Sequence, residues 1–269
     1  MKKGKNQTGS YVETKSGRLF VNVSGEGDPL LLIHGVGTDA EYYHDAAQIL
    51  ARSYRVMTYD RPGYSRSASG TDGNSVEGQT LQTAELIDAL SPEGVRIAAS
   101  SAGCLIAYEL AARRPEKVKG LLLYEPPITD DPEIRAEIAV LTECLKEMNA
   151  KRRAAKALME FVRVSGGYDK TAASESLERL SQNFANFQHF LDDEMESILG
   201  YTQKDLPAVC VPITVAAGDM DVEGLFNRCA VSMAKRYCLP LVTVHGYHNF
   251  PKDRPGEFAK LAEDVFRSI

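Results

Sequence analysis

Residues 96–115, with the sequence RIAASSAGCLIAYELAARRP, place a serine where it could act as a nucleophile. Ser101 lies where an apolar, strand-like run turns within a few small residues into a helix-like segment. A nucleophile at such a turn has a strained backbone and tolerates only small side chains two residues before and two residues after it. Ala99 and Gly103 occupy these positions. Ser100 would have Gly103 three residues away, so we interpret Ser100 as a solvated or capping serine and predict Ser101 as the nucleophile.

A serine nucleophile needs a general base. The histidines of the chain are His34, His44, His189, His245 and His248. His248 follows a strand-like run and Gly246 and precedes a terminal helix, which places it on a loop above the carboxyl edge of a sheet. We therefore predict His248 as the general base. His245, at the strand end, is interpreted as a packed or surface residue. His189, within an apolar stripe, is interpreted as a structural residue or at most one that lines a pocket. His44 is interpreted as an ordinary helix residue that is close enough to a preceding glycine loop to face substrate.

That glycine loop belongs to the run LLLIHGVG, residues 30–37, a strand-like segment followed by a tight turn. Backbone N–H groups in such a turn can stabilise the negative charge that develops on a carbonyl oxygen during acyl transfer. We predict an oxyanion hole made by the amide of Gly35 or Val36 together with the amide of Ala102. His34 is expected to fix the turn without touching substrate. A phosphate cradle is not expected, because G-x-G-x-x-G and the P-loop lysine are both absent.

Unbroken apolar runs recur along the chain, as strands buried on both faces require. The runs are LLLI (30–33), VMTY (56–59), RIAA (96–99), LLLY (121–124), ITVAA (213–217) and LVTV (241–244). Helix-like segments lie between them, at residues 79–90, 103–114, 226–237 and 255–269. This alternation predicts an α/β fold with a mostly parallel, doubly wound sheet. Ahead of it, residues 11–23 read as a β-hairpin that turns at Lys15, Ser16 and Gly17.

The alternation breaks once, between about residues 128 and 205, where only helical periodicity is found. An apolar stripe with three- and four-residue spacing must face another surface there. It consists of Phe184, Phe187, Phe190, Leu191, Met195 and Ile198. We predict a helical cap at 128–205, inserted into a core formed by residues 1–127 and 206–269. Gly166 and Gly167 are expected to separate two cap helices.

Composition limits the classes of partner. The formal net charge of -6 offers a polyanion no general attraction, so nucleic acid is not an expected partner. No run approaches the roughly 18 apolar residues that span a bilayer, and the N-terminal lysines precede no signal-like stretch. We therefore expect a cytoplasmic protein without membrane association. The five cysteines are odd in number, form no CxxC pair and lie mostly among apolar residues, as buried free thiols do, so neither a disulfide framework nor a zinc site is expected.

Taken in order, the HG turn, DRPGYSRS at residues 60–67, the Ser101 turn and the GYH segment ending at His248 resemble the α/β-hydrolase superfamily. The resemblance covers the chain outside the cap. It implies an α/β-hydrolase fold with the cap inserted after the sixth strand. DRPGYSRS is similar to the D-x-x-G-x-G-x-S turn of the superfamily, with Ser65 in place of the second glycine. More narrowly, the chain resembles the branch that contains the zearalenone lactonases, in which a D-x-P-G-x-S-R-S segment, an acid-Pro dipeptide after the sixth strand and a short G-x-H loop occur.

The resemblance leaves two candidates for the acid that orients His248. In most of the superfamily the acid follows the seventh strand, three residues beyond a glycine, and Asp221 after Gly218 fits that spacing. In the lactonase-like branch a glutamate follows the sixth strand, which corresponds to Glu125 in YEPP. We favour Glu125, because a strand followed by Glu-Pro-Pro aims one carboxylate rigidly. The acids of GDMDVEG are scattered in a polar loop and read as solvated, whereas the alternative for Glu125 is a salt-bridged residue at the hinge of the cap.

These residues predict a serine hydrolase that needs no cofactor and no metal. His248, oriented by the carboxylate, would remove the proton of Ser101 as it attacks an ester or lactone carbonyl. The apolar cap stripe favours a small, uncharged and fairly hydrophobic substrate. A carbon-carbon bond hydrolase with the same triad and a non-catalytic ligand-binding protein of the same fold are the alternatives. The sequence is compatible with a homo-oligomer and does not specify one.

Overall fold

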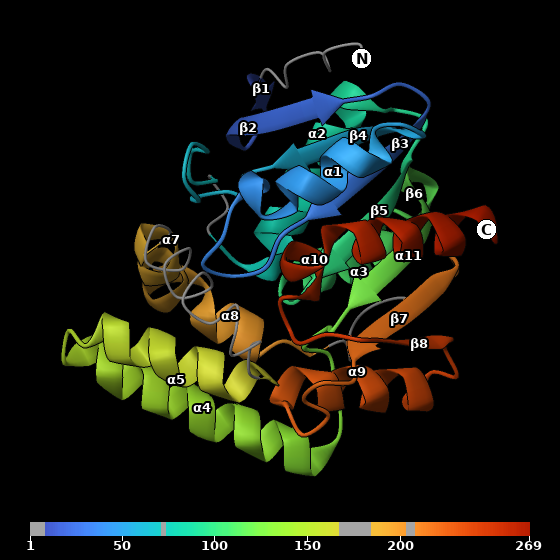
Figure 1. Ribbon diagram of the computed structural model, residues 1–269. Helices are drawn as coiled ribbons and strands as arrows, with labels where there is room; N and C mark the ends of the chain where they lie inside the picture. Colours follow the sequence, from blue (N-terminus) through green and yellow to red (C-terminus); the bar gives the residue numbers. More distant parts are fainter. Residues whose placement is uncertain (1–8, 71–73, 167–183, 203–207) are drawn as a thin grey trace.

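The computed structural model describes residues 9–70, 74–166, 184–202 and 208–269. Among these residues, eight strands form a single sheet in the order β1-β2-β4-β3-β5-β6-β7-β8 (Figure 1). The strands are β1 (Ser10–Thr14), β2 (Gly17–Ser24), β3 (Asp28–Ile33), β4 (Tyr54–Tyr59), β5 (Val95–Ser100), β6 (Val118–Tyr124), β7 (Ile213–Gly218) and β8 (Leu241–Val244). β1, β2 and β4 pair antiparallel and all other neighbours pair parallel. The predicted mostly parallel sheet and the opening hairpin are both confirmed.

Alternate residues of the central strands pack into two separate clusters of the described core. In β6, Leu121 and Leu123 belong to one cluster, whereas Leu122 and Tyr124 belong to the other. All four side chains are fully buried. Because both faces of the sheet are covered, the strand has no solvent-exposed face and its sequence shows no alternation of polar and apolar residues. This burial is the physical origin of the unbroken apolar runs.

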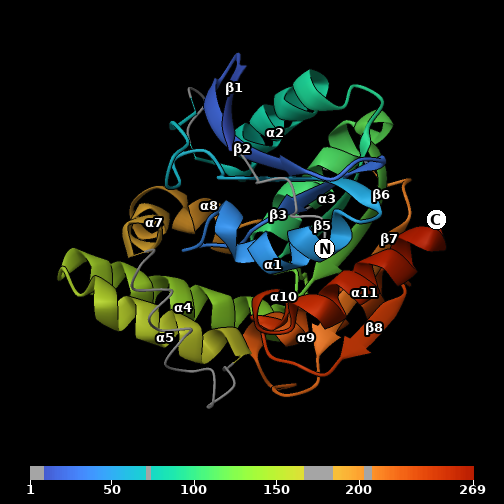
Figure 2. The same cartoon turned by 45° about the horizontal axis from the view of Figure 1, so that its top comes forward.

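Helices cover both faces of the sheet (Figure 2). On one face α1 packs against α11, and on the other α2 packs against α3 while α9 packs against β7. These helices are α1 (His44–Leu50), α2 (Val76–Leu90), α3 (Gly103–Arg113), α9 (Leu225–Arg236) and α11 (Pro255–Arg267). Shorter helical turns are η1 (Ala40–Tyr43), η2 (Pro115–Lys117) and α10 (Phe250–Asp253). The arrangement is the doubly wound architecture that the sequence predicts.

Between β6 and β7 the regular elements of the described residues are all helices, and these helices lie together beyond one end of the sheet (Figure 1). They are α4 (Pro132–Ala150), α5 (Ala154–Gly166), α7 (Phe184–His189), η3 (Phe190–Glu194) and α8 (Met195–Leu199). We refer to this set as the cap helices. η3 is a π-helix, which continues α7 directly into α8. Gly166 ends α5, while Gly167 and the predicted boundary at residues 205 and 206 lie outside the described residues.

The structure differs from the sequence-based expectation at the last strand. β8 was expected to be buried on both faces, but it pairs only with β7 and lies at the edge of the sheet. Its residues alternate between exposed and half-buried, and Leu241 is 40% exposed. An apolar run of four residues does not distinguish a central strand from an edge strand, because pairing on one side is enough to form it. The cysteines also differ from expectation, since Cys210 and Cys238 are exposed.

None of the helices in the described ranges is long and apolar enough to cross a bilayer.

Candidate active site

Ser101 lies between the end of β5 and the start of α3, followed there by Ala102. Its backbone has a φ of 52°, in the left-handed region that non-glycine residues rarely adopt. The Ser101 N–H donates to the Tyr124 carbonyl at 3.0 Å, and the Ser101 carbonyl accepts from the Cys104 N–H at 2.9 Å. These bonds tie the strained residue to β6 on one side and to the helix on the other. The strain is therefore maintained by the surrounding structure, as is common for a nucleophile.

The small residues around Ser101 follow from close backbone packing. A Cβ atom added to Gly103 would lie 2.4 Å from the Ile33 carbonyl oxygen and 2.8 Å from the His34 carbonyl oxygen. Only glycine lets the start of α3 approach the end of β3 this closely. Ala99, two residues before Ser101, is fully buried within β5. The predicted size restriction on both neighbours is thus a packing requirement of the strand–turn–helix unit.

His248 and Glu125 are joined by a short hydrogen bond. Nδ1 of His248 lies 2.6 Å from Oε2 of Glu125. The other carboxylate oxygen, Oε1, accepts from the Gly218 N–H at 3.0 Å and from Asn227 Nδ2 at 3.3 Å. The Glu125 side chain is 3% exposed and that of His248 is 12% exposed. The ring of His248 also packs on Phe226 of α9, with centroids 5.2 Å apart. Both carboxylate oxygens are used, so the imidazole is held in one orientation.

Glu125 directly follows β6, as the YEPP segment predicts. Its φ of 46° is also left-handed, and its N–H donates to the Ala216 carbonyl at 2.9 Å. The alternative acid, Asp221, forms no hydrogen bond or ion pair with His248 among the described residues. In the same loop, Asp219 is exposed and lies 3.0 Å from Nδ1 of the exposed His245. Of the two candidates, Glu125 is the one that the structure shows hydrogen-bonded to His248.

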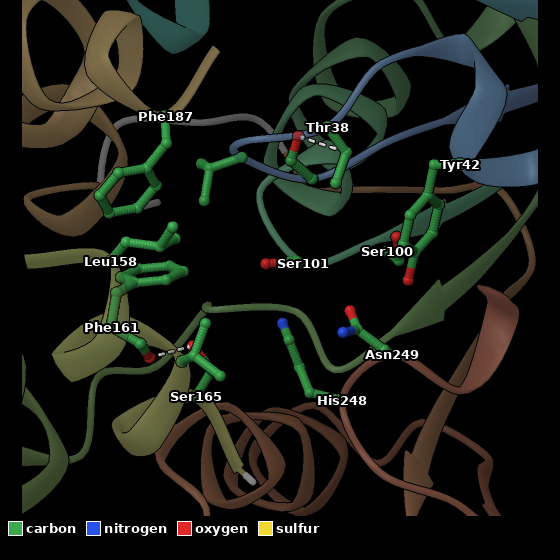
Figure 3. A pocket seen from close by; sticks show the side chains of 13 residues that line it. Thr38, Tyr42, Ser100, Ser101, Leu158, Phe161, Ser165, Phe187, His248 and Asn249 are labelled. Carbon is green, nitrogen blue, oxygen red and sulfur yellow. Dashed lines mark hydrogen bonds between the residues drawn. The ribbon is translucent and has the colours of Figure 1, made fainter. Parts of the chain in front are cut away.

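Ser101 and His248 line one pocket at the carboxyl edge of the sheet. Figure 3 shows a ring nitrogen of His248 directed towards Ser101. Nδ1 is bound to Glu125, so Nε2 is the nitrogen available to the serine. The cap contributes the apolar side chains of Leu158, Phe161 and Phe187 to this pocket.

The pocket also has a polar end, lined by Tyr42, Ser100 and Asn249. The interpretation of Ser100 as a solvated or capping serine was wrong. Ser100 is the last residue of β5, is 2% exposed and accepts a hydrogen bond from Tyr43 at 2.9 Å. Ser100 is therefore a buried residue beside the nucleophile and not a solvated one.

The glycine loop lies against Ser101. A Cβ atom added to Gly35 would lie 2.9 Å from Ser101 Cβ, so the backbone of the loop reaches the nucleophile directly. None of the hydrogen bonds among the described residues uses the amides of Gly35, Val36 or Ala102. Ala102 directly precedes α3, where the helix N-terminus favours negative charge. The predicted oxyanion residues are thus gathered around Ser101, with their N–H groups unused.

His34 fixes the glycine loop through hydrogen bonds of both ring nitrogens. It is fully buried, donates from Nδ1 to the Gly35 carbonyl at 2.8 Å and accepts at Nε2 from the Arg61 N–H at 3.1 Å. Burial, aided by the positive charge of Arg61, lowers the pKa of His34 to about 3. The ring is therefore neutral at physiological pH and can both donate and accept. His34 does not line the pocket, in line with the role expected for it.

The remaining histidines lie elsewhere. His44 begins α1, is 46% exposed and faces Glu41 rather than the pocket. His189 packs edge-on against Tyr64 and lies 3.0 Å from Asp193. Neither lines the pocket that holds Ser101.

Sequence reasoning missed several residues that support the site. Asn227 holds Glu125, and nothing in the amphipathic pattern of α9 marks it. Tyr42 and Asn249 line the pocket beside Ser100. Arg61 was quoted within DRPGYSRS without a role, although it is fully buried and donates to the Gly35 carbonyl at 3.2 Å. The sequence feature that could have indicated a buried role for Arg61 is its place beside Asp60 directly after a buried strand.

Comparison with known proteins agrees with this architecture. A model of the alpha/beta hydrolase family matches residues 30–261. The uncharacterised hydrolase YraK of Bacillus subtilis is 27% identical over 271 residues, which cover 94% of each chain. Zearalenone hydrolase of Cladophialophora bantiana is 28% identical over 268 residues, which cover 96% of each chain. The structure of a thermophilic esterase from Thermogutta terrifontis superposes with a TM-score of 0.78 at 19% identity, covering 97% of this chain and 98% of that one, and supports the fold.

Proposed function

The chain belongs to the alpha/beta hydrolase family, and from that premise we propose that it is a serine hydrolase that cleaves an ester or lactone through an acyl-enzyme on Ser101. The observation that carries the proposal is the placement of Ser101. It occupies a left-handed strand–helix turn and shares one pocket with His248, whose far nitrogen is bound to the buried Glu125. Nucleophile, base and orienting acid are the three parts that acyl transfer needs.

In this mechanism His248 Nε2 accepts the Ser101 proton as Oγ attacks the substrate carbonyl carbon. The carbonyl oxygen becomes negatively charged and is stabilised by the amide of Ala102 and an amide of the glycine loop. His248 then protonates the leaving alkoxide, which departs as the alcohol, or stays attached in a lactone. A water gives its proton to His248 and attacks the acyl-enzyme. The acid is released and Ser101 regains its proton.

The substrate class follows from the walls of the pocket. Leu158, Phe161 and Phe187 of the cap form an apolar wall, and the described residues that line the pocket include no lysine or arginine. A phosphorylated or otherwise strongly anionic substrate would find no cation there, so we propose an uncharged, fairly hydrophobic ester or lactone. The relative named zearalenone hydrolase supports lactones as the first class to assay. The net charge of -6 also supports a small-molecule substrate rather than nucleic acid.

A fluorophosphonate probe tests the proposal without knowledge of the substrate. Ser101 Oγ should attack phosphorus and expel fluoride, and mass spectrometry should map one label to Ser101. A binding protein that only keeps the fold would not be labelled. Modification of Ser165, which lines the same pocket, in place of Ser101 would argue against the assigned nucleophile.

The cap should set substrate preference through Phe187, and Phe190 supplies a matched control. Both rings are buried and both pack on Phe161, with centroids 5.8 and 5.4 Å away, but only Phe187 is among the pocket-lining residues. Either alanine variant should lose about 3–5 kcal/mol of stability. We expect Phe187→Ala to change the ratio of kcat/KM between a short and a bulky acyl ester by about tenfold, and Phe190→Ala to leave it unchanged. That ratio does not depend on the folded fraction of the protein. Equal changes in both variants would therefore mean that the two rings contribute only to packing in the core of the cap.

A further inference from the structure

A fully buried ion pair connects the core to the cap. Arg61 follows β4 and Glu194 ends η3, and neither side chain is exposed to solvent. Nη1 of Arg61 lies 3.2 Å from Oε1 of Glu194, and Nη2 lies 3.4 Å from Oε2. Gln79 of α2 donates to Oε1 at 2.8 Å, and Tyr64 donates to Oε2 at 2.5 Å. Burial alone would lower the pKa of Arg61, but the charge of Glu194 reverses the effect and raises it, so the guanidinium stays charged.

The same guanidinium also holds the glycine loop. Nη2 of Arg61 donates to the Gly35 carbonyl at 3.2 Å, and His34 Nδ1 donates to that oxygen at 2.8 Å. In a trans peptide the C=O and the following N–H point in opposite directions. A Gly35 carbonyl held towards the buried Arg61 therefore turns the Val36 N–H away from this cluster. Val36 itself lines the pocket. Of the two amides predicted for the loop side of the oxyanion hole, this geometry favours Val36.

A second cap residue holds the other end of the loop. Nδ2 of Asn186, in α7, donates to the Thr38 carbonyl at 3.1 Å and to Ser65 Oγ at 2.9 Å. Its Oδ1 accepts from the Ser65 N–H at 2.9 Å. Asn186 is 4% exposed, so its amide is buried against the core, while its partner Ser65 is exposed. The cap segment from Asn186 to Glu194 thus reaches the glycine loop at two points, one of them through Arg61.

A buried ion pair is weak evidence for stability, because the cost of removing two charges from water offsets most of their attraction. The pair does fix the orientation of the groups bound to it, since a planar guanidinium binds several acceptors in fixed geometry. Glu194 is presented by a π-helix, a rare form that is frequent at functional sites. The placement of this pair, between the cap and the peptide beside the nucleophile, is therefore better explained by positioning than by stability.

We propose that Glu194, acting through Arg61, is a positioning residue by which the docked cap aims the Val36 amide at the oxyanion of the transition state. The inference rests on the proposed serine hydrolase function. It extends that function by making the cap part of the catalytic geometry as well as a wall of the pocket.

The test compares three variants of the full chain with the wild type. Glu194→Gln removes the charge but keeps the shape. The double variant Arg61→Met/Glu194→Met removes both charges, leaves no buried ion unpaired and retains apolar volume, so it can fold where the single variant does not. Glu196→Gln is the matched control, because Glu196 lies two residues away on α8, is 74% exposed and forms an ion pair with the surface residue Lys146. The readouts are the rate of Ser101 phosphonylation by a fluorophosphonate, kcat and KM for p-nitrophenyl butyrate, and the folded fraction from thermal unfolding.

We expect kcat and the phosphonylation rate to fall by about 10- to 100-fold in Glu194→Gln and in the double variant. Displacing an oxyanion donor from its productive position can lower the rate by up to about 100-fold. KM should change less than about twofold, and Glu196→Gln should match the wild type. Wild-type rates in a folded double variant, losses that equal the loss of folded protein, or a change in KM alone would each overturn the positioning role while leaving the serine mechanism intact. A wild type that is not labelled at Ser101 would instead overturn the proposed function.

Discussion

Replacing Ser101 with alanine should lower kcat by on the order of 10⁵- to 10⁶-fold, because it removes the atom that forms the acyl-enzyme and leaves only the oxyanion amides and substrate binding to act. The change removes one oxygen at a residue that is 8% exposed and creates no core cavity. The backbone bonds of Ser101 to Tyr124 and Cys104 remain. The thermal unfolding midpoint should therefore stay close to that of the wild type. Steady-state kinetics on the best ester or lactone, with the midpoint measured in parallel, checks both expectations.

Ser165→Ala is the control for Ser101→Ala. Ser165 lines the same pocket, but its hydroxyl is bound to the Phe161 carbonyl within α5 at 2.6 Å. Its loss should alter kcat by less than about tenfold, as expected for a residue outside the reacting groups. Full activity in Ser101→Ala would rule out the mechanism. An inactive Ser100→Ala beside an active Ser101→Ala would move the nucleophile one residue towards the N-terminus.

Glu125→Gln should reduce turnover by about 10⁴-fold, because an amide cannot stabilise the imidazolium that forms when His248 takes the serine proton. Glutamine has the shape of glutamate and can still accept from the Gly218 N–H, so the fold should persist. Asp221→Asn is the matched control, since Asp221 was the other candidate acid and forms no hydrogen bond or ion pair with His248 among the described residues. It should cost far less activity. Kinetics of both variants across pH, compared with the wild type, provides the measurement.

The reverse ranking of these two variants would make Asp221 the acid and Glu125 a structural residue at the cap junction. Comparable, partial losses in both would mean that either carboxylate can orient His248, and the double variant should then lose much more activity than either single one. The hydrogen bond of 2.6 Å between Glu125 and His248 favours the large loss in Glu125→Gln.

The parts of the site that could be predicted from the sequence are those with local physical causes. Ser101 was identified from small residues within two positions of it, and the Gly103 requirement is a contact with the neighbouring strand. Glu125 was favoured because a strand end followed by two prolines fixes a single direction. His248 was found from its place between the last strand and the last helix. In each case the chain within a few residues determines where the side chain lies.

The parts that were missed depend on contacts between distant residues. Arg61 and Glu194 are 133 positions apart, and Glu194 is one of several acidic residues that interrupt the apolar stripe, with nothing in the sequence to mark it as buried. Only the packed cap removes that carboxylate from water. The burial of Ser100 and the exposure of β8 likewise depend on which elements cover them. Sequence patterns report that a side chain is polar or apolar, but not which surface finally covers it.

The insertion of the cap between adjacent strands also bears on how the enzyme acquires activity during folding. The carboxylate of Glu125 binds the Gly218 N–H 93 residues later and the His248 ring 123 residues later. Loop-closure entropy grows only with the logarithm of loop length. Closing the loop between Glu125 and Gly218 therefore costs only about 1.4 kcal/mol more free energy than closing a crossover of about 20 residues. The long insertion thus lowers the equilibrium stability only slightly, but contacts of such high sequence separation tend to form slowly. A nascent chain that ends within the cap already carries Ser101 and Glu125 but not His248, so the proposed mechanism makes hydrolytic competence arise only after synthesis of the last strand and the segment that follows it.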